Sequence, residues 1–251
     1  MASSRMYLFG GPHPWSPNDW TSQDDRVRGG ASTSYLTASP DSTSASFTGT
    51  LDISTLGGAG FASQRTTVEK SWDLSAYDGL ELDIDATNSD GKKYTLILKD
   101  AKGILPPRDD GRERSGLSWE VDFEPTGRDP KGKVVVRWED LRPTYRGKEV
   151  GDVEKLDLRD IKRFSLMMRR FVLLSAFLAI DANVVGSFFG TQEGEFRLAI
   201  VSIAAWKDEE KDGLEKKGGI VVETKETIDD DESWSVFGDL DNSQPACCVI
   251  L

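Results

Sequence analysis

The sequence is poor in the residue types that most often build catalytic and metal sites. Among 251 residues, His13 is the only histidine, and Cys247 and Cys248 are the only cysteines. A histidine-based triad or metal centre is therefore not expected, and the core offers no disulfide and no thiol nucleophile. We expect a domain that folds without metal, cofactor or disulfide in a reducing compartment.

Basic residues are also in deficit. The formal net charge is −12, which argues against nucleic acid as a partner, because phosphate neutralisation requires a basic surface. The same charge argues against a purely electrostatic attachment to anionic lipid. Arg5 is the only basic residue among the first twenty, so neither a secretory signal nor a mitochondrial presequence is expected there.

Catalytic motifs are missing as well. No phosphate-binding loop and no dinucleotide-binding glycine motif occurs in the sequence. Two adjacent acidic pairs, Asp24 with Asp25 and Asp109 with Asp110, are candidates for acid–base chemistry. Sequence alone does not set the carboxylate separation that such chemistry needs, and in an acidic chain such pairs are usually solvated. We therefore expect a protein that is not an enzyme.

Alternating apolar and polar residues are the main structural signal. Residues 80–86 and 117–123 alternate cleanly, which predicts strands with one buried and one solvated face. Residues 94–98, 134–138, 161–168 and 196–203 indicate further strands. Asn88 to Gly91 form a predicted turn between the strands at 80 and 94, and a short helix is conceivable near Trp138. Many short strands with Gly, Asp and Pro between them predict an all-β sandwich or barrel.

The stretch from Asp24 to Tyr35 is the most distinctive segment. It places Gly29 and Gly30 between alternating charges and a run of small hydroxyl residues. Residues 44–53 follow with period-two alternation and predict a strand, and a second glycine cluster follows at 57–60. On composition alone, the two glycine clusters indicate the turns that flank the strands of a β-hairpin.

The order of these segments resembles the complex I intermediate-associated protein 30 domain family. The resemblance rests on Trp20, Asp25, Gly29-Gly30-Ala31-Ser32, Phe47-Thr48-Gly49, Gly60-Phe61-Ala62-Ser63-Gln64-Arg65, Asp73-Leu74-Ser75-Ala76-Tyr77-Asp78-Gly79, Pro143-Thr144-Tyr145-Arg146-Gly147, Phe188-Phe189-Gly190 and Gly194-Glu195-Phe196-Arg197-Leu198. It covers most of the chain between Trp15 and Trp206. The resemblance implies a jelly-roll β-sandwich of the galactose-binding-like type. It also implies a function in the assembly of mitochondrial respiratory complex I.

Four residues are candidates for ligand or partner binding: Asp25, Arg28, Arg65 and Arg146. Arg65 and Arg146 fall at positions that match the family, and the alternative is that both hold loops through backbone carbonyls. Residues 101–114 form a charged connection rich in Pro and Gly. Such a connection is either a solvated loop, which we favour, or a binding loop of the sandwich.

The expected domain limits are a flexible N-terminus at 1–14, a sandwich at 15–207 and an acidic linker at 208–251. Within the sandwich, residues 170–186 are expected to be an insertion foreign to the family pattern. Its apolar run is shorter than the ~20 residues of a membrane-spanning helix. A retained-intron artefact is the favoured explanation, and an interfacial helix or hydrophobic plug is the alternative.

From Asp208 onward the composition is acidic, and residues 224–246 of this tail are expected to be largely disordered. The chain ends Cys248-Val249-Ile250-Leu251, which fits the prenylation pattern, and Cys247 offers a second acylation site. Stable anchoring takes two such signals. This pattern predicts a lipid-anchored peripheral membrane protein on the cytosolic face, with the mitochondrion as the alternative address.

Two functions therefore compete. The favoured one is a non-enzymatic, chaperone-like assembly factor that binds partner polypeptides, among them complex I intermediates. The alternative is a lipid-anchored carbohydrate- or ligand-binding module at the cytosolic face of a membrane.

Overall fold

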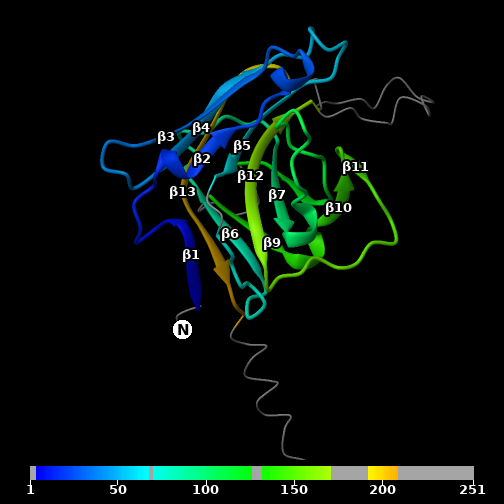
Figure 1. Ribbon diagram of the computed structural model, residues 1–251. Coiled ribbons are helices and arrows are strands. Elements are labelled where there is room, and N and C mark those ends of the chain that lie inside the picture. Colours follow the sequence, from blue (N-terminus) through cyan, green and yellow to red (C-terminus); the bar gives the residue numbers. More distant parts are fainter. Residues whose placement is uncertain (1–3, 68–69, 126–131, 171–191, 209–251) are drawn as a thin grey trace, which may run out of the picture. The chain divides into compact units, whose positions relative to one another are not determined.

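The computed structural model describes residues 4–67, 70–125, 132–170 and 192–208. These residues form antiparallel strands and short 3-10 helices, arranged as two sheets (Figure 1). The chain passes repeatedly from one sheet to the other, so neighbouring strands are rarely consecutive in sequence. The predicted all-β sandwich of jelly-roll type is confirmed.

Sheet A has six strands, in the order β3-β4-β13-β6-β9, with β1 also paired to β13. Its strands are β1 (Arg5–Gly10), β3 (Thr33–Ala38), β4 (Ala45–Leu51), β6 (Gly79–Ile84), β9 (Lys133–Arg137) and β13 (Gly194–Trp206). The long strand β13 organises this sheet: one part of it pairs with β4, and the part nearer Trp206 lies between β1 and β6.

Sheet B has seven strands, in the order β11-β10-β8-β7-β12-β5-β2. Its strands are β2 (Trp20–Ser22), β5 (Phe61–Thr66), β7 (Tyr94–Asp100), β8 (Ser118–Phe123), β10 (Arg142–Tyr145), β11 (Lys148–Glu149) and β12 (Ile161–Arg169). The 3-10 helices are η1 (Pro17–Asp19), η2 (Asp25–Arg28), η3 (Ala101–Gly103) and η4 (Trp138–Asp140). The helix η4 lies where the sequence suggested a short helix.

Each strand predicted from alternation is present within a few residues of its expected limits. The turn at Asn88 to Gly91 does connect β6 to β7, but these strands belong to different sheets. It is therefore a crossing between the sheets and not a hairpin. The residues of the expected insertion lie outside the described ranges except Arg170, which donates from Nη1 to the Gly58 carbonyl at 2.7 Å.

The predicted flexible N-terminus at 1–14 is wrong for Arg5–Gly10, which forms β1 and pairs with β13 from Trp206 to Ser202. Trp15 continues this attachment, because its indole N–H donates to the Val201 carbonyl at 2.9 Å. Gly10 is needed at this point, since a Cβ there would lie 2.2 Å from the Val201 oxygen. The pairing partner is almost two hundred residues away, so local sequence gave no sign of it.

The core between the sheets contains two groups of aromatic rings. Phe9, Trp15, Trp20, Trp72 and Phe164 form one group, with ring centroids 4.9 Å apart for Phe9 and Trp20 and 5.1 Å for Trp72 and Phe164. The other group contains Phe47, Tyr94, Phe123 and Phe196. Burial of such rings dominates the stability of a small sandwich.

Candidate functional site

Asp25, the first candidate residue, is fully buried and its carboxylate is occupied. One oxygen accepts from the Ser32 backbone N–H at 3.0 Å, and the other accepts from Ser32 Oγ at 2.7 Å and from the Phe61 N–H at 3.1 Å. The carboxylate thereby connects η2 to the beginning of β3 and to the beginning of β5. These strands belong to different sheets, so Asp25 fastens the sandwich and does not present a ligand-binding group.

Asp24 repeats this arrangement one residue earlier. It accepts from the Ser34 N–H at 3.1 Å, from Ser34 Oγ at 2.6 Å and from the Ser63 N–H at 3.0 Å. We call Asp24, Asp25, Ser32 and Ser34 the aspartate clasp. Gly30 serves this clasp, because a Cβ on Gly30 would lie 2.3 Å from Asp25 Cγ.

The three candidate arginines do not converge. Arg28 lies over the Phe61 ring at 5.4 Å, and Arg146 lies over the Tyr145 ring at 5.3 Å, in the turn between β10 and β11. Arg65 is on β5, four strand spacings away from β10 across sheet B. At ~4.8 Å per spacing this is roughly 19 Å, so Arg65 and Arg146 do not serve one small-molecule site.

Arg65 belongs instead to a cluster that sequence reasoning did not assemble. On the outer face of sheet B, Arg65 on β5 and Arg163 on β12 both bind the Glu113 carboxylate, at 2.6 Å and 2.9 Å. Gln23 donates to the same carboxylate at 2.9 Å. Lys99 on β7 lies opposite Arg163 in the strand register. Neighbouring strands of one sheet thus bring three cations together.

These side chains line a cavity of about 360 Å³ that we call the basic pocket. It is bounded by the sheet and by the connection after β7, and its lining residues are Arg65, Lys99, Gly103, Ile104, Leu105, Pro107, Gly111, Glu113, Arg114 and Arg163. Four of these are cations and one is an anion, an excess of three positive charges. The connection at 101–114, for which a solvated loop was favoured, therefore forms a wall of a polar cavity.

The electrostatics of the basic pocket reflect this excess. Burial lowers the pKa of Lys99, and repulsion from Arg163 lowers it further. Burial also lowers the pKa of Arg65, with Arg163 again contributing. The Nε of Arg65 is buried and has no hydrogen-bond acceptor among the described residues. The pocket thus holds more positive charge than its own acid compensates.

Elsewhere on the outer face of sheet B, positive charge is matched. Arg169 on β12 contacts Glu120 at 2.7 Å and Asp122 at 3.1 Å, both on β8, which lies on the other side of β7. Thr144 donates to Glu120 at 2.6 Å. Here two carboxylates face one arginine, which is the reverse of the balance in the basic pocket.

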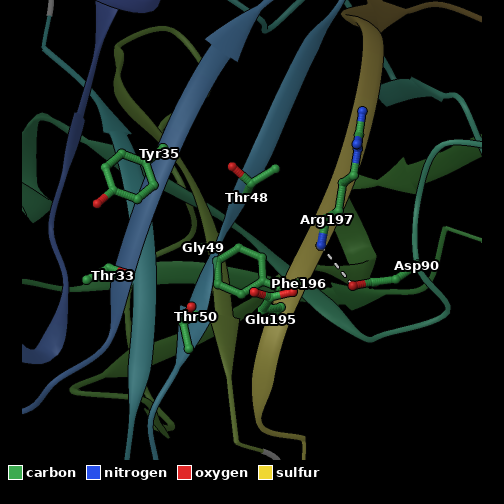
Figure 2. A pocket seen from close by; sticks show the side chains of 9 residues that line it. All are labelled: Thr33, Tyr35, Thr48, Gly49, Thr50, Asp90, Glu195, Phe196 and Arg197. Carbon is green, nitrogen blue, oxygen red and sulfur yellow. Dashed lines mark hydrogen bonds between the residues drawn. The ribbon is translucent and has the colours of Figure 1, made fainter.

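A second concave surface lies on the outer face of sheet A, with a volume of about 530 Å³ (Figure 2). We call it the sheet A groove. Figure 2 shows Tyr35 on β3, Thr48 on β4 and Arg197 on β13, which share one row of the strand register. Thr33, Thr50 and Glu195 form the adjacent row. Tyr35 is 60% exposed, so the groove presents an exposed aromatic residue among threonine hydroxyls and charged side chains.

Asp90 holds the end of the sheet A groove in place. Its carboxylate accepts from the Arg197 backbone N–H at 2.8 Å, drawn as the dashed line in Figure 2, and from the Tyr94 hydroxyl at 2.8 Å. Its own N–H donates to the Arg197 carbonyl at 2.8 Å. Asp90 therefore joins the crossing between β6 and β7 to the edge of β13. Burial of Tyr94, together with the Asp90 charge, raises the pKa of the Tyr94 phenol.

Within the described ranges, no group of three or more His, Cys, Asp or Glu side chains is placed to hold a metal ion. The same residues contain no helix long and apolar enough to cross a membrane. Cys247 and Cys248 lie outside the described residues, as does the acidic linker from residue 209 onward.

Sequence reasoning missed Lys99, Glu113 and Arg163. Lys99 and Arg163 stand next to buried apolar residues within strands, and such isolated basic residues are normally read as the solvated face of a sheet. The charged connection at 101–114, a candidate binding loop in the sequence, is the signal that points to this site. The pairing of β7 with β12 decides that these charges meet.

Known proteins place the chain as follows. The sequence profile described as complex I intermediate-associated protein 30 matches residues 7–200. An uncharacterized protein of Schizosaccharomyces pombe is 40% identical over 204 residues, which cover 80% of this chain and 83% of that protein. Among solved structures, a family 11 carbohydrate-binding module from Clostridium thermocellum, in complex with a β-1,3-1,4-mixed-linked tetrasaccharide, is similar with a TM-score of 0.48. The two are 12% identical, over 82% of this chain and 98% of that module.

Proposed function

Because the chain belongs to the complex I intermediate-associated protein 30 family, we propose that it is a non-enzymatic assembly protein that holds a partner polypeptide. Family membership supports a function related to complex I assembly. The finer statement, that this chain binds a polypeptide intermediate through a surface of the sandwich, is our proposal.

The sheet A groove is the observation that carries this proposal. It is shallow and open, and it exposes the Tyr35 side chain on β3 and the Arg197 side chain on β13, with Thr48 of β4 between them. Tyrosine and arginine are, with tryptophan, enriched among the residues that anchor protein interfaces, because they offer large contact area together with hydrogen bonds. Threonine hydroxyls around them suit the backbone amides of a polypeptide.

The hydrogen bonds of Asp24, Asp25 and Asp90 support a non-enzymatic role. A general acid or base must be able to reach a proton of the substrate, whereas the Asp24 and Asp25 carboxylates each accept three hydrogen bonds from within the sandwich. Asp90 in the sheet A groove is similarly engaged by the backbone of β13 and by Tyr94. These groups position strands.

The test is partner capture by a groove variant. We expect Tyr35→Ala to reduce co-purification of complex I intermediates from cells and to delay their maturation on native gels. Tyr145→Ala is the matched control, because Tyr145 is also exposed, at 42% against 60% for Tyr35, but lies on sheet B. Equal capture by the wild type and Tyr35→Ala would contradict the proposed use of the groove.

A carbohydrate-binding module is the second candidate, and the exposed Tyr35 ring beside Thr33, Thr48 and Thr50 is the observation that favours it. Sugar rings stack on aromatic faces, and their hydroxyls exchange hydrogen bonds with groups of this kind. Affinity electrophoresis through gels containing soluble β-glucans separates the two functions. Retardation that is lost in Tyr35→Ala would favour the module.

The expected cellular location depends on which of these two functions the protein has. The family is associated with mitochondrial complex I, which favours the mitochondrion, the alternative address in the sequence prediction. The lipid anchor at Cys248 stays a prediction. The mass of the C-terminal peptide from the native source decides it, because prenylation adds a lipid to Cys248 that Cys248→Ser would lack.

A further inference from the structure

The basic pocket is a concentration of positive charge in an acidic chain. Four cations line it in a protein whose net charge is −12. Clustering cations on neighbouring strands costs free energy through repulsion and desolvation. A charge arrangement that works against stability marks a candidate binding site.

We propose that the basic pocket binds a doubly charged oxyanion, namely a phosphate group, held by Lys99, Arg163 and Arg114. This site is separate from the sheet A groove and does not depend on the proposed partner binding. It takes inorganic phosphate or the phosphate of a small monoester.

Two cations of the basic pocket lack an acidic partner. Lys99 Nζ makes one long hydrogen bond, to the Gly103 carbonyl at 3.4 Å. Neither Lys99 nor Arg114 has a carboxylate within ion-pair distance among the residues that the structure describes. Both side chains line the cavity, so an anion inside it gains two charge-assisted contacts without breaking an ion pair of either residue.

The contacts of Glu113 show what kind of ligand Arg65 and Arg163 bind. Arg163 donates to both Glu113 oxygens, at 2.9 Å and 3.3 Å, and Arg65 reaches one of them at 2.6 Å. A carboxylate oxygen thus already occupies the position of an anionic ligand beside this pair. The buried, unpaired Nε of Arg65 leaves a further donor in the same cluster.

Charge and size together favour a phosphate group over a simple carboxylate. A dianion compensates more of the excess positive charge, and phosphate accepts from several Arg and Lys donors at once. The cavity of about 360 Å³ is within the range of small-molecule sites. Ile104, Leu105 and Pro107 give one wall apolar character, which suits the organic part of a small phosphate monoester.

Isothermal titration of the full chain with inorganic phosphate tests the proposal, with sodium chloride and acetate at matched ionic strength as references. We expect saturable binding of phosphate at one site and none of acetate. Lys99→Met and Arg163→Gln should each weaken phosphate binding about tenfold or more. Arg112→Gln is the matched control, because Arg112 is in the same connection but exposed and paired with Asp110 at 2.6 Å.

For Glu113→Gln we expect phosphate affinity to change in the opposite direction. Removing the internal carboxylate eliminates its repulsion of the ligand, so phosphate affinity should rise about threefold or more. A purely structural ion-pair cluster predicts no phosphate binding in any variant. Phosphate heats equal to those of sodium chloride, or dissociation constants unchanged in both Lys99→Met and Glu113→Gln, would overturn the proposal.

The source of the phosphate is decided by titrating a small monoester, glycerol phosphate, and a phosphoserine peptide alongside inorganic phosphate. Binding of the monoester at least as tight as that of inorganic phosphate identifies a small-molecule ligand. Tight binding confined to the peptide would overturn the small-molecule site in favour of a protein partner. Partner capture through Tyr35 is measured separately, so failure of either proposal leaves the other standing.

Discussion

The aspartate clasp and the basic pocket adjoin the same strand, β5, but differ in how their charges are compensated. In the clasp, two buried carboxylates are satisfied by serine hydroxyls and by backbone N–H groups, including those of Phe61 and Ser63 on β5. In the basic pocket, the Arg65 side chain of the same strand joins cations that outnumber their acid. The strand β5 thus serves a fully satisfied site through the backbone N–H groups of Phe61 and Ser63, and an unsatisfied one through the Arg65 side chain.

The difference separates a structural role from a binding role. A buried carboxylate that accepts three hydrogen bonds has no capacity left for a ligand, and its removal leaves buried donors unpaired. Cations without acids destabilise the fold but remain ready for an anion. We therefore expect opposite stability effects when each kind of charge is removed.

The largest expected effect comes from breaking the clasp. Asp25→Ala should lower the free energy of unfolding by about 3 kcal/mol or more, because three buried donors lose their acceptor at about 1–3 kcal/mol each. Urea denaturation followed by tryptophan fluorescence measures it. Asp73→Ala is the control, since Asp73 accepts from Ser75 N–H and Oγ in a similar local motif but at the surface. Its unfolding midpoint should hardly move.

A smaller effect is expected when the clasp is crowded. Gly30→Ala should lower the free energy of unfolding by about 1–3 kcal/mol, because its Cβ must displace the Asp25 carboxylate. In Gly91→Ala the added Cβ meets open space, so stability should stay equal or rise slightly. If the two variants unfolded at the same urea concentration, Gly30 would not be required by the clasp.

Removing a cation from the basic pocket should raise the free energy of unfolding, whereas changes to the clasp lower it. We expect Lys99→Met to raise the free energy of unfolding by about 0.5–1 kcal/mol, because Lys99 is desolvated and repelled by Arg163. The same variant loses phosphate binding in the titration described above. A marked fall in its thermal unfolding midpoint would show that the Lys99 charge stabilises the fold.

The smallest expected effect is a pH dependence at Glu113. Burial raises the pKa of this carboxyl, but Arg163 and Arg65 and their hydrogen bonds lower it more, so its folded-state pKa lies below the ordinary 4.5. A depressed carboxyl pKa contributes stability above the unfolded-state value, and that stability is lost as the pH falls through the folded-state value. Glu113→Gln should therefore lose less stability than the wild type below pH 4.5. Parallel stability profiles for the two proteins in acid would contradict this assignment.

Strands with clean alternation were predictable because their apolar and polar residues alternate locally, according to which face of the strand is buried and which is solvated. The strands β6 and β8 are of this kind, and both were found within a residue or two of their predicted limits. By contrast, β1 and β5 were missed: β1 lies in a segment rich in glycine and proline, and β5 follows directly on a glycine turn. Both are defined by distant pairing, β1 with β13 and β5 with β12.

The candidate site was predictable only in part. Asp25 and Arg65 were singled out from the sequence, yet the structure places one in a clasp and the other in a charged pocket. Gly30 was singled out as a turn residue, and the structure adds that only a hydrogen fits against Asp25. Lys99 and Arg163 carried no signal of their own, because an isolated basic residue in a strand resembles ordinary surface.

The all-β class, the family, the net negative charge and the scarcity of histidine and cysteine could all be established from the amino-acid sequence, because they depend on composition, on local period and on the order of motifs. Which charges meet depends on how distant strands pair in the fold. Residues 65, 99, 113 and 163 are separated by tens of positions in the chain, and the pairing of β5, β7 and β12 brings them to one face. Whether a charge is satisfied depends on groups delivered by other strands, so the distinction between clasp and pocket exists only in the folded protein.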